Sequence, residues 1–377
     1  MKIPVYIRYI FGIPILLVSP LASGLLLPQT VTFSYHNEIV ARPNPTAFVL
    51  GDFHRDGILD LAVLDQGSTK VAILRGIGNG NFVPFTDAQA GVGPVALATG
   101  DFNGDGILDL LVANNISNSV SILLGNGNGT FRPFNTVEAS GPTALVIGDF
   151  NRDGRLDFAV TNSNSGSVSI WLGNGNGTFR TALTYRVETN PVFLAAGDFN
   201  GDGKLDLAVV NKNSNTVSIL LGTGTGIFLP AVNYGAGEAP AGLVLGDFNG
   251  DGKIDIAIAD SLGSTNTLSL LLGLGNGTFR TPLTFNAGKN PTFLLAADLN
   301  GDGNLDLALA NTMSNSISIL LGTGRGSFLP SLSFATGKGP AWLSLIDYTA
   351  NGKPDLIVAN SFEDTLSVLY NVTSSRR

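Results

Sequence analysis

The sequence repeats one acidic motif at a nearly constant interval, and this period limits the available folds more than any other feature. The stretch GDFNGDGILDL, residues 100–110, returns six more times in lightly varied form. The first aspartates of the copies are Asp52, Asp101, Asp149, Asp198, Asp247, Asp298 and Asp347, at intervals of 49, 48, 49, 49, 51 and 49 residues. Such a period is typical of solenoids and propellers, in which each repeat is one supersecondary unit.

One repeat, read from Pro191, predicts four strands. Its apolar runs are PVFLAAGDF, LDLAVVN, VSILLG and LPAVNYGAG, separated by the acidic loop, an Asn/Ser turn and a Gly-rich turn. Short runs rich in Val, Ile, Leu and Phe that end at Gly, Asn or Pro favour strands. Several runs are apolar throughout, which is expected of strands that are packed on both faces.

Seven such units predict a ring, because each sheet needs neighbours on both faces and a ring leaves no bare end. The last repeat stops after its third strand, TLSVLYNV, while residues 30–40, TVTFSYHNEIV, offer a strand that has no repeat of its own. We therefore predict an all-β protein, a seven-bladed β-propeller of four-stranded blades, closed by an N-terminal strand that completes the last blade.

The N-terminal residues 1–24 predict an export signal. Lys2 and Arg8 precede an uncharged apolar run, and Ala22, Ser23 and Gly24 supply the small residues at which signal peptidase cleaves. The alternative is an uncleaved membrane anchor, since residues 9–27 are long enough to span a bilayer. We expect a propeller over residues 30–371, a tail over 372–377 and a secreted or cell-surface location, with no membrane span unless the N-terminal segment is retained.

The acidic loops place oxygen-bearing side chains at positions 1, 3, 5 and 9, with Gly at position 6. Calcium prefers six to eight hard oxygen ligands on such a curled backbone, with a carbonyl at position 7. The alternative is that Asp, Asn and Gly simply make good turns. Against this, the seven loops hold 20 of the 29 acidic residues of the chain, and clustered carboxylates repel one another unless a cation lies among them.

We therefore predict about five or six calcium ions with a mainly structural role. The first loop is weaker because His54 replaces Asn at position 3. The seventh has Thr349 and Asn351 at positions 3 and 5, and its residues are not among the predicted ligands. The predicted ligands are Asp101, Asn103, Asp105, Asp109, Asp149, Asn151, Asp153, Asp157, Asp198, Asn200, Asp202, Asp206, Asp247, Asn249, Asp251, Asp255, Asp298, Asn300, Asp302, Asp306 and, in the first loop, Asp52, Asp56 and Asp60.

On these motifs the chain resembles bacterial FG-GAP or VCBS repeat proteins and is similar to the propeller head of integrin α chains. The acidic loop is the most specific part of the likeness, and the segment YGAGEAP, Tyr234–Pro240, is a looser part. The resemblance covers about residues 30–371. It implies an exported, calcium-binding propeller that serves in adhesion or ligand binding, and it does not name the ligand.

The rim opposite the acidic loops is the predicted place for a protein or glycan ligand. Its turns are rich in amides and hydroxyls, which suits sugar hydroxyls and plain solvated turns alike. The second residue after each repeat's Pro varies, and it is aromatic at Phe193, Phe293 and Trp342. At the mouth of an inner strand these rings could stack on a ligand; the alternative is that they plug the channel.

A binding or adhesion module is favoured over an enzyme. The chain has no Cys and only two His, so thiol catalysis is excluded and a His-based site has few candidates. A net charge of −8 argues against a nucleic-acid partner. The near-constant repeat length leaves no inserted catalytic loop. The alternative function is that of a propeller-fold carbohydrate-active enzyme, a lyase or a hydrolase.

Overall fold

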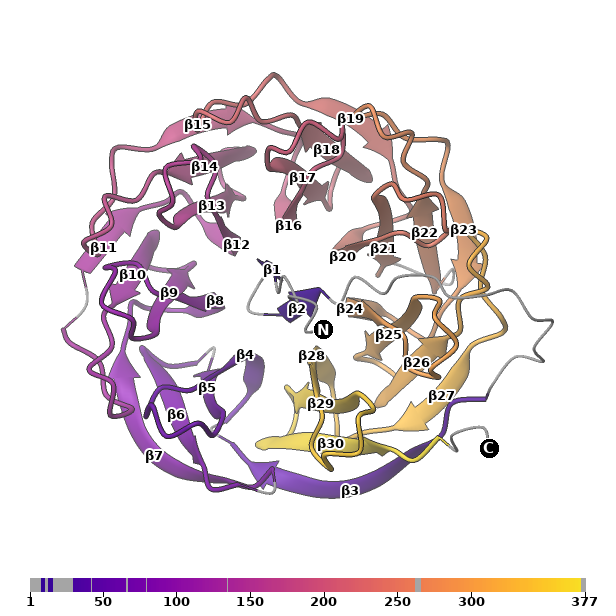
Figure 1. Cartoon of the computed structure of the whole chain (residues 1–377), viewed down its shortest axis with the longest axis horizontal. Helices are drawn as coiled ribbons and strands as arrows, with labels where there is room; N and C mark the ends of the chain where they lie inside the picture. The colour runs from indigo at the N-terminus through magenta and orange to yellow at the C-terminus, as the bar shows by residue number, and fades with distance from the viewer. Residues whose placement is uncertain are drawn as a thin grey trace, which may run out of the picture.

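The computed structural model describes residues 8–10, 13–15, 30–41, 43–65, 67–78, 80–133, 135–261 and 266–373, which form strands and no helix. Seven sheets of four strands make up the ring (Figure 1). The first three blades comprise β4 (Pro45–Gly51), β5 (Asp60–Asp65), β6 (Lys70–Gly76), β7 (Phe82–Gln89); β8 (Pro94–Gly100), β9 (Asp109–Asn114), β10 (Ser119–Leu123), β11 (Asn135–Glu138); and β12 (Pro142–Gly148), β13 (Asp157–Asn162), β14 (Ser167–Trp171), β15 (Leu183–Arg186).

The fourth to seventh blades continue the same order around the ring. They comprise β16 (Pro191–Gly197), β17 (Asp206–Asn211), β18 (Thr216–Leu220), β19 (Val232–Gly235); β20 (Pro240–Gly246), β21 (Asp255–Asp260), β22 (Thr267–Leu271), β23 (Leu283–Asn286); β24 (Pro291–Ala297), β25 (Asp306–Asn311), β26 (Ser316–Leu320), β27 (Leu332–Ala335); and β28 (Pro340–Ile346), β29 (Asp355–Asn360), β30 (Thr365–Asn371) with β3 (Phe33–Val40).

The predicted closure of the ring is confirmed. Strand β3, from near the N-terminus, pairs antiparallel with β30, so that Phe33 lies opposite Asn371 and Val40 lies opposite Thr365. Figure 1 shows β3 running along the outer edge of the seventh blade, next to the C-terminal strand. The ends of the propeller are therefore joined by backbone hydrogen bonds between chain segments more than 300 residues apart, and no covalent bond is needed.

The burial of the strands follows their place in the blade. The second strand of a blade, such as β9, is buried at all six positions because neighbouring blades cover both of its faces. The fourth strand, such as β15, is exposed at most positions. This difference explains why the second strands are apolar throughout in the sequence, whereas the fourth strands carry polar residues.

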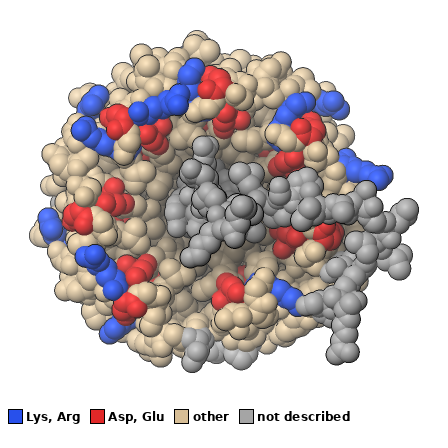
Figure 2. Space-filling model, viewed as in Figure 1, with Lys and Arg blue, Asp and Glu red and all other residues tan. Residues whose placement is uncertain are grey.

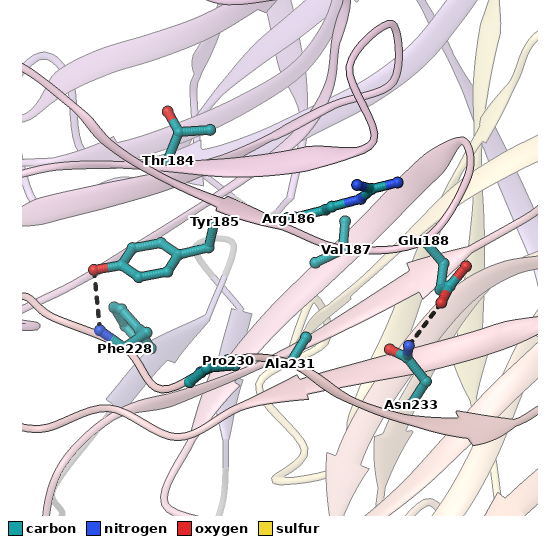
Figure 3. A pocket seen from close by; sticks show the side chains of 9 residues that line it. All are labelled: Thr184, Tyr185, Arg186, Val187, Glu188, Phe228, Pro230, Ala231 and Asn233. Carbon is teal, nitrogen blue, oxygen red and sulfur yellow. Dashed lines mark hydrogen bonds between the residues drawn. The ribbon is translucent and has the colours of Figure 1, made fainter.

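Two features of the surface bear on function. Figure 2 shows acidic side chains at intervals around one face of the ring, most of them with a Lys or Arg beside them. On the outer circumference, a groove of about 450 Å³ follows the seam between β15 and β19 (Figure 3).

A short hairpin lies within the predicted export signal. Strands β1 (Arg8–Ile10) and β2 (Ile13–Ile15) pair in a two-stranded sheet. Most of residues 1–24, and residues 374–377 of the predicted tail, lie outside the described residues, so signal, anchor and domain boundaries stay predictions. Across the described residues, no helix has the length and apolar character needed to cross a bilayer.

Candidate functional site

The fully matching acidic loops share one hydrogen-bonded geometry at their exposed tips. In the second blade, the Asp101 carboxylate accepts N–H bonds from Gly104 (2.7 Å), Asp105 (3.2 Å) and Gly106 (2.8 Å). The Asn103 amide oxygen accepts the Asp105 N–H at 2.9 Å. Positive φ angles at Gly104 and Gly106 allow this tight turn. The loops that begin at Asp149, Asp198, Asp247 and Asp298 repeat the bonds from positions 5 and 6 to the first-position carboxylate and from position 5 to the Asn.

The ninth-position aspartates have a structural role that the sequence reading missed. Asp109 is fully buried, and its Oδ2 accepts the Phe102 N–H at 2.9 Å while its Oδ1 accepts the Gly125 N–H at 2.8 Å. These bonds pin the acidic loop to the end of the third strand of the same blade. The equivalent carboxylates, all fully buried and bonded to two such amides, are Asp60, Asp157, Asp206, Asp255, Asp306 and Asp355.

Burial raises the pKa of the Asp109, Asp157, Asp206, Asp255, Asp306 and Asp355 carboxyl groups. The pKa of Asp109 rises to about 6, chiefly because burial disfavours the charged form, and the nearby charges of Asp105 and Asp101 add to the rise. The pKa of Asp306 rises to about 8 for the same reason. The two backbone N–H donors oppose the shift without cancelling it. A cation beside the loop would favour the ionised form of these groups.

The loops fit calcium by donor chemistry, since every predicted ligand offers a carboxylate or amide oxygen. The side chains of these residues, however, are hydrogen-bonded to groups of the same blade. The Asn103 Nδ2 donates to the Asp105 Oδ2 at 2.9 Å, and both Asp109 oxygens accept backbone N–H bonds. Among the described residues, no group of three or more His, Cys, Asp or Glu side chains is arranged to hold a metal ion. Calcium binding therefore stays a prediction that rests on the donor set.

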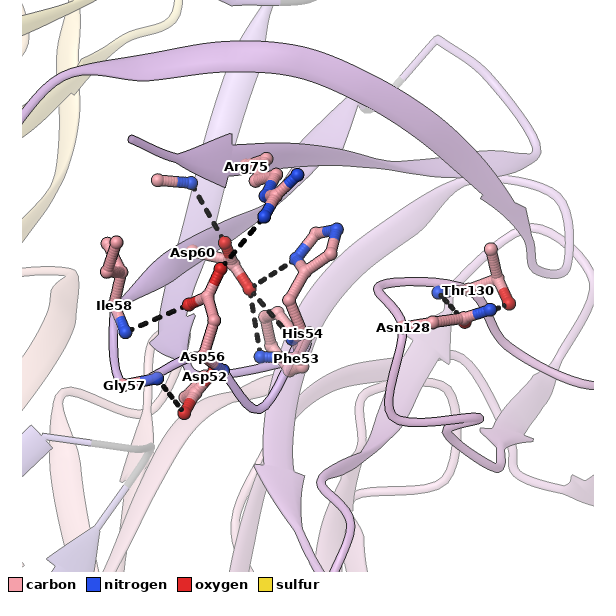
Figure 4. A network of polar contacts seen from close by, with 11 residues as sticks. Asp52, Phe53, His54, Asp56, Gly57, Ile58, Asp60, Arg75, Asn128 and Thr130 are labelled. Carbon is pink, nitrogen blue, oxygen red and sulfur yellow. Dashed lines mark hydrogen bonds and ion pairs between the residues drawn. The ribbon is translucent and has the colours of Figure 1, made fainter. Parts of the chain in front are cut away.

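The first loop differs because His54 turns inward (Figure 4). Its Nδ1 lies 2.8 Å from the Asp60 Oδ2, and its ring packs edge-on against Phe85 with centroids 4.5 Å apart. Arg75 pairs with Asp56 at 3.1 Å and lowers the pKa of that carboxyl. The side chain at position 3, which is Asn in the fully matching loops, is here a His bonded to the ninth-position carboxylate, and this gives a physical reason for the weak metal site that was predicted here.

In the seventh loop, as in the first, the side chain at position 3 contacts the ninth-position carboxylate. The Thr349 backbone N–H and hydroxyl both lie within hydrogen-bond reach of the Asp355 Oδ2, at 3.1 and 3.4 Å. Asp347 still accepts N–H bonds from Asn351 and Gly352, at 3.0 and 2.9 Å. The loop thus keeps its turn with only two carboxylates.

Five of the acidic loops also contact the next blade in the same way. The Phe53 carbonyl of the first loop accepts the Gly129 N–H of the Gly-rich turn in the second blade, at 2.8 Å, and the Phe53 ring packs edge-on against Phe131. The same pair of contacts recurs at the next four seams, between Phe102 and Gly177 with Phe179, Phe150 and Gly226 with Phe228, Phe199 and Gly277 with Phe279, and Phe248 and Gly326 with Phe328. A metal ion bound in one of these loops would therefore affect the contact between two blades as well as the loop itself.

The predicted ligand-stacking rings lie together in the centre of the ring. Phe293 stacks on Trp342 with ring centroids 4.0 Å apart, and it meets Phe193 edge-on at 5.9 Å. All three are buried, with exposures of 3 to 7%. Gly242 on the intervening strand has no side chain to separate Phe193 from Phe293. This packing corresponds to the channel-plugging alternative; ligand stacking stays a prediction.

A family model for the FG-GAP-like repeat matches six overlapping stretches, residues 52–112, 101–160, 149–209, 198–258, 247–309 and 298–358. The chain belongs to the FG-GAP-like repeat family. Each match begins at the first aspartate of one acidic loop and ends within the second strand of the next blade. Each match therefore joins the acidic loop and the last three strands of one blade to the first strand and acidic loop of the next. No curated protein matches the chain in sequence.

Solved structures resemble this FG-GAP-like repeat protein in fold. One is BBS1N in complex with ARL6DN, with a TM-score of 0.64 and 13% identity over 91% of this chain and 98% of that one. An Agrocybe aegerita lectin that recognises non-reducing terminal N-acetylglucosamine matches with a TM-score of 0.57 and 18% identity, over 88 and 86%. A virginiamycin B lyase from Staphylococcus aureus matches with 0.60 and 12%, over 92 and 100%. At these identities the likeness shows the fold alone.

Proposed function

We propose that this FG-GAP-like repeat protein is an exported, calcium-stabilised propeller that binds a protein or glycan ligand on the rim opposite the acidic loops. We choose this rim because of one observation. The turns between second and third strands expose large apolar side chains at Ile116, Met313 and Phe362, with exposures of 69, 67 and 63%. These residues lie at the tips of turns that otherwise consist mainly of Asn, Ser and Thr.

The position of these residues supports a shared surface. They belong to the second, sixth and seventh blades, which are three of four consecutive blades in the closed ring. Large apolar side chains that are exposed on one rim of a soluble protein are candidates for a binding surface. The propellers that resemble this chain in fold include one in complex with a protein and one that recognises a sugar, which supports both ligand classes as candidates.

The proposal is for a non-catalytic role. Lectins and lyases share this fold, so the fold does not decide between binding and catalysis. His54, the histidine whose ring the structure describes, is hydrogen-bonded to the buried Asp60 carboxylate below a joint between blades. An assay of the purified protein on oligosaccharides, for hydrolysis or elimination, tests the enzyme alternative directly.

A binding screen with matched variants tests the proposal. The purified chain, with calcium present, is screened on a glycan array and against extracellular matrix proteins. Any ligand found is then titrated against the triple variant Ile116→Ser, Met313→Ser and Phe362→Ser. The control is Ile227→Ser, which removes a side chain of 51% exposure from the acidic-loop side. We expect the triple variant alone to lose affinity; equal affinity for both variants would place the ligand elsewhere.

A further inference from the structure

The groove between the third and fourth blades is built from polar groups that meet across the seam. The Asn233 Nδ2 on β19 donates to the Glu188 Oε1, just beyond β15, at 2.8 Å. The Tyr185 hydroxyl on β15 accepts the Phe228 N–H at 3.1 Å, and the two rings pack edge-on with centroids 5.7 Å apart. Figure 3 shows both bonds bridging the two blades. The groove is therefore held in shape from both sides.

This seam departs from the repeat. Arg186 lies opposite Ser167, the first residue of the third strand, and Glu188 follows two residues later. By the same register, the fourth blade has Gly235 and Gly237 at these two places, and the fifth has Asn286 and Gly288. In a chain whose blades otherwise agree closely, a guanidinium and a carboxylate that gather in one groove are not needed to form the ring.

The groups in the groove suit a ligand with several hydroxyls. Within the described residues, the Arg186 guanidinium has no hydrogen-bond or ion-pair partner, so its donors can bind a ligand. Glu188 has a second carboxylate oxygen that can accept. Buried Val187 and Phe228 form an apolar floor beside Pro230. Sugar hydroxyls both donate and accept hydrogen bonds, and a pyranose ring has an apolar face that can pack on such a floor.

We propose that this groove is a saccharide site, in which Arg186 and Glu188 bind vicinal hydroxyls of a neutral sugar and Pro230 packs against its apolar face. The volume of about 450 Å³ lies in the range of small-molecule sites and accommodates one or two sugar rings. The inference rests on the proposed binding function and extends it, since this site lies on the circumference and not on the opposite rim.

The test uses saturation-transfer NMR of the full chain with methyl glycosides of N-acetylglucosamine, galactose, glucose and mannose at millimolar concentration. Binders are titrated against Arg186→Ala and Glu188→Ala, and against two controls on the corresponding strands of other blades, Glu138→Ala and Asn286→Ala. We expect the dissociation constant to rise about tenfold or more in the two groove variants, because each loses a charged hydrogen-bonding group, and to stay unchanged in the controls.

Two results would overturn the inference. If no glycoside receives saturation from the wild-type chain, the groove is not a saccharide site, and a protein ligand found in the screen described above would leave the proposed function standing. If a glycoside binds equally well to the groove variants and more weakly to the triple variant of the opposite rim, the sugar binds at that rim. In that case the proposed function holds and the groove does not contribute.

Discussion

The Asn371 side chain joins the sixth and seventh blades, because its Nδ2 donates a 2.7 Å hydrogen bond to the Leu299 carbonyl. At five other seams, a glycine N–H of the next blade's Gly-rich turn makes this bond. The seventh blade has no such turn, since its fourth strand comes from the N-terminal side of the ring. The Asn371 backbone N–H also donates to Asp355 at 2.7 Å, where other blades use the first glycine of the turn. One asparagine thus replaces two donors at the closing blade.

Replacing Asn371 should weaken the closure of the ring. The Asn371→Ala variant leaves the buried Leu299 carbonyl without this donor and removes the oxygen that accepts the Thr373 N–H at 3.1 Å. We expect the free energy of unfolding to fall by about 1–3 kcal/mol. Urea denaturation measures this, with the exposed Asn286→Ala as the control. Equal stability of the two variants would mean that the strand pairing of β3 with β30 closes the ring unaided.

The joint glycines should tolerate no side chain. A Cβ at Gly129 would collide with the His54 ring, and Gly129 also has a φ of +77°. Gly78 is the matched control, because its φ is +82° but a Cβ there meets no atom within 4 Å. Gly78→Ala should cost about 1 kcal/mol from backbone strain alone. Gly129→Ala should lower the melting temperature more than Gly78→Ala does, because it adds a collision with the His54 ring to the backbone strain. An equal loss in the two variants would show that this collision between blades is unimportant.

Calcium should stabilise the ring through the five fully matching loops. At about 1 mM calcium, a site with a dissociation constant of about 0.1 mM adds about 1.4 kcal/mol to the free energy of unfolding. We therefore expect the melting temperature to rise steadily in a calcium titration and to fall in EDTA. Asp105→Asn, in a full loop, should weaken this response more than Asp56→Asn, in the loop where Arg75 pairs with the same position. A melt indifferent to calcium would contradict the metal prediction.

The repeat made the fold predictable from the sequence, but it did not reveal the hydrogen-bond partners of individual side chains. Period, strand count and the closing strand follow from local patterns that recur seven times in one chain. The burial of Asp109 could not be predicted, because its two amide donors come from the loop and from a glycine 16 residues away. A signal was present: the ninth position is Asp in all seven loops, whereas His and Thr replace Asn at the third. The role of Asn371 depends on a contact 72 residues distant, which no local pattern encodes.

Without calcium, the buried Asp306 carboxyl should make the protein more stable at lower pH. The folded-state pKa of Asp306 is raised to about 8, above its unfolded value of about 3.9. Its contribution is therefore complete below that unfolded value and is lost as the pH rises through about 8. In EDTA, the free energy of unfolding should rise between pH 8 and pH 5, and Asp306→Asn should flatten this slope.

The control for the pH experiment is Asp56→Asn. The pKa of Asp56 is lowered by Arg75, so its contribution is present above the unfolded pKa and is lost only as the pH falls below it. This variant should leave the slope between pH 8 and pH 5 unchanged. The slope is the informative quantity, because Asn at position 306 can accept only one of the two backbone N–H bonds and lowers stability at every pH. An unchanged slope in Asp306→Asn would contradict the assignment.

At Asp260, unlike at Asp306, the change to Asn is expected to increase the stability of the protein. It is a fully buried carboxylate at the end of β21 and accepts the Ser269 hydroxyl at 2.8 Å. At the same place in the sixth blade, the Asn311 Nδ2 donates to the Ser318 hydroxyl at 2.9 Å. Burial raises the pKa of Asp260 to about 6, so its stability contribution is lost as the pH rises through about 6. Asp260→Asn removes the buried charge and can form the bond that Asn311 makes.

We therefore expect Asp260→Asn to raise the free energy of unfolding at pH 8 by about 1–3 kcal/mol, since one unit of pKa corresponds to about 1.4 kcal/mol. Well below the unfolded pKa of about 3.9 the carboxyl is protonated in both states, and the gain should vanish. The reverse change, Asn311→Asp, should lower stability at pH 8, which makes it the matched control. Urea denaturation at the two pH values measures both variants. A stabilisation that is equal at pH 8 and below pH 4 would mean that packing, and not charge, sets the difference between these blades.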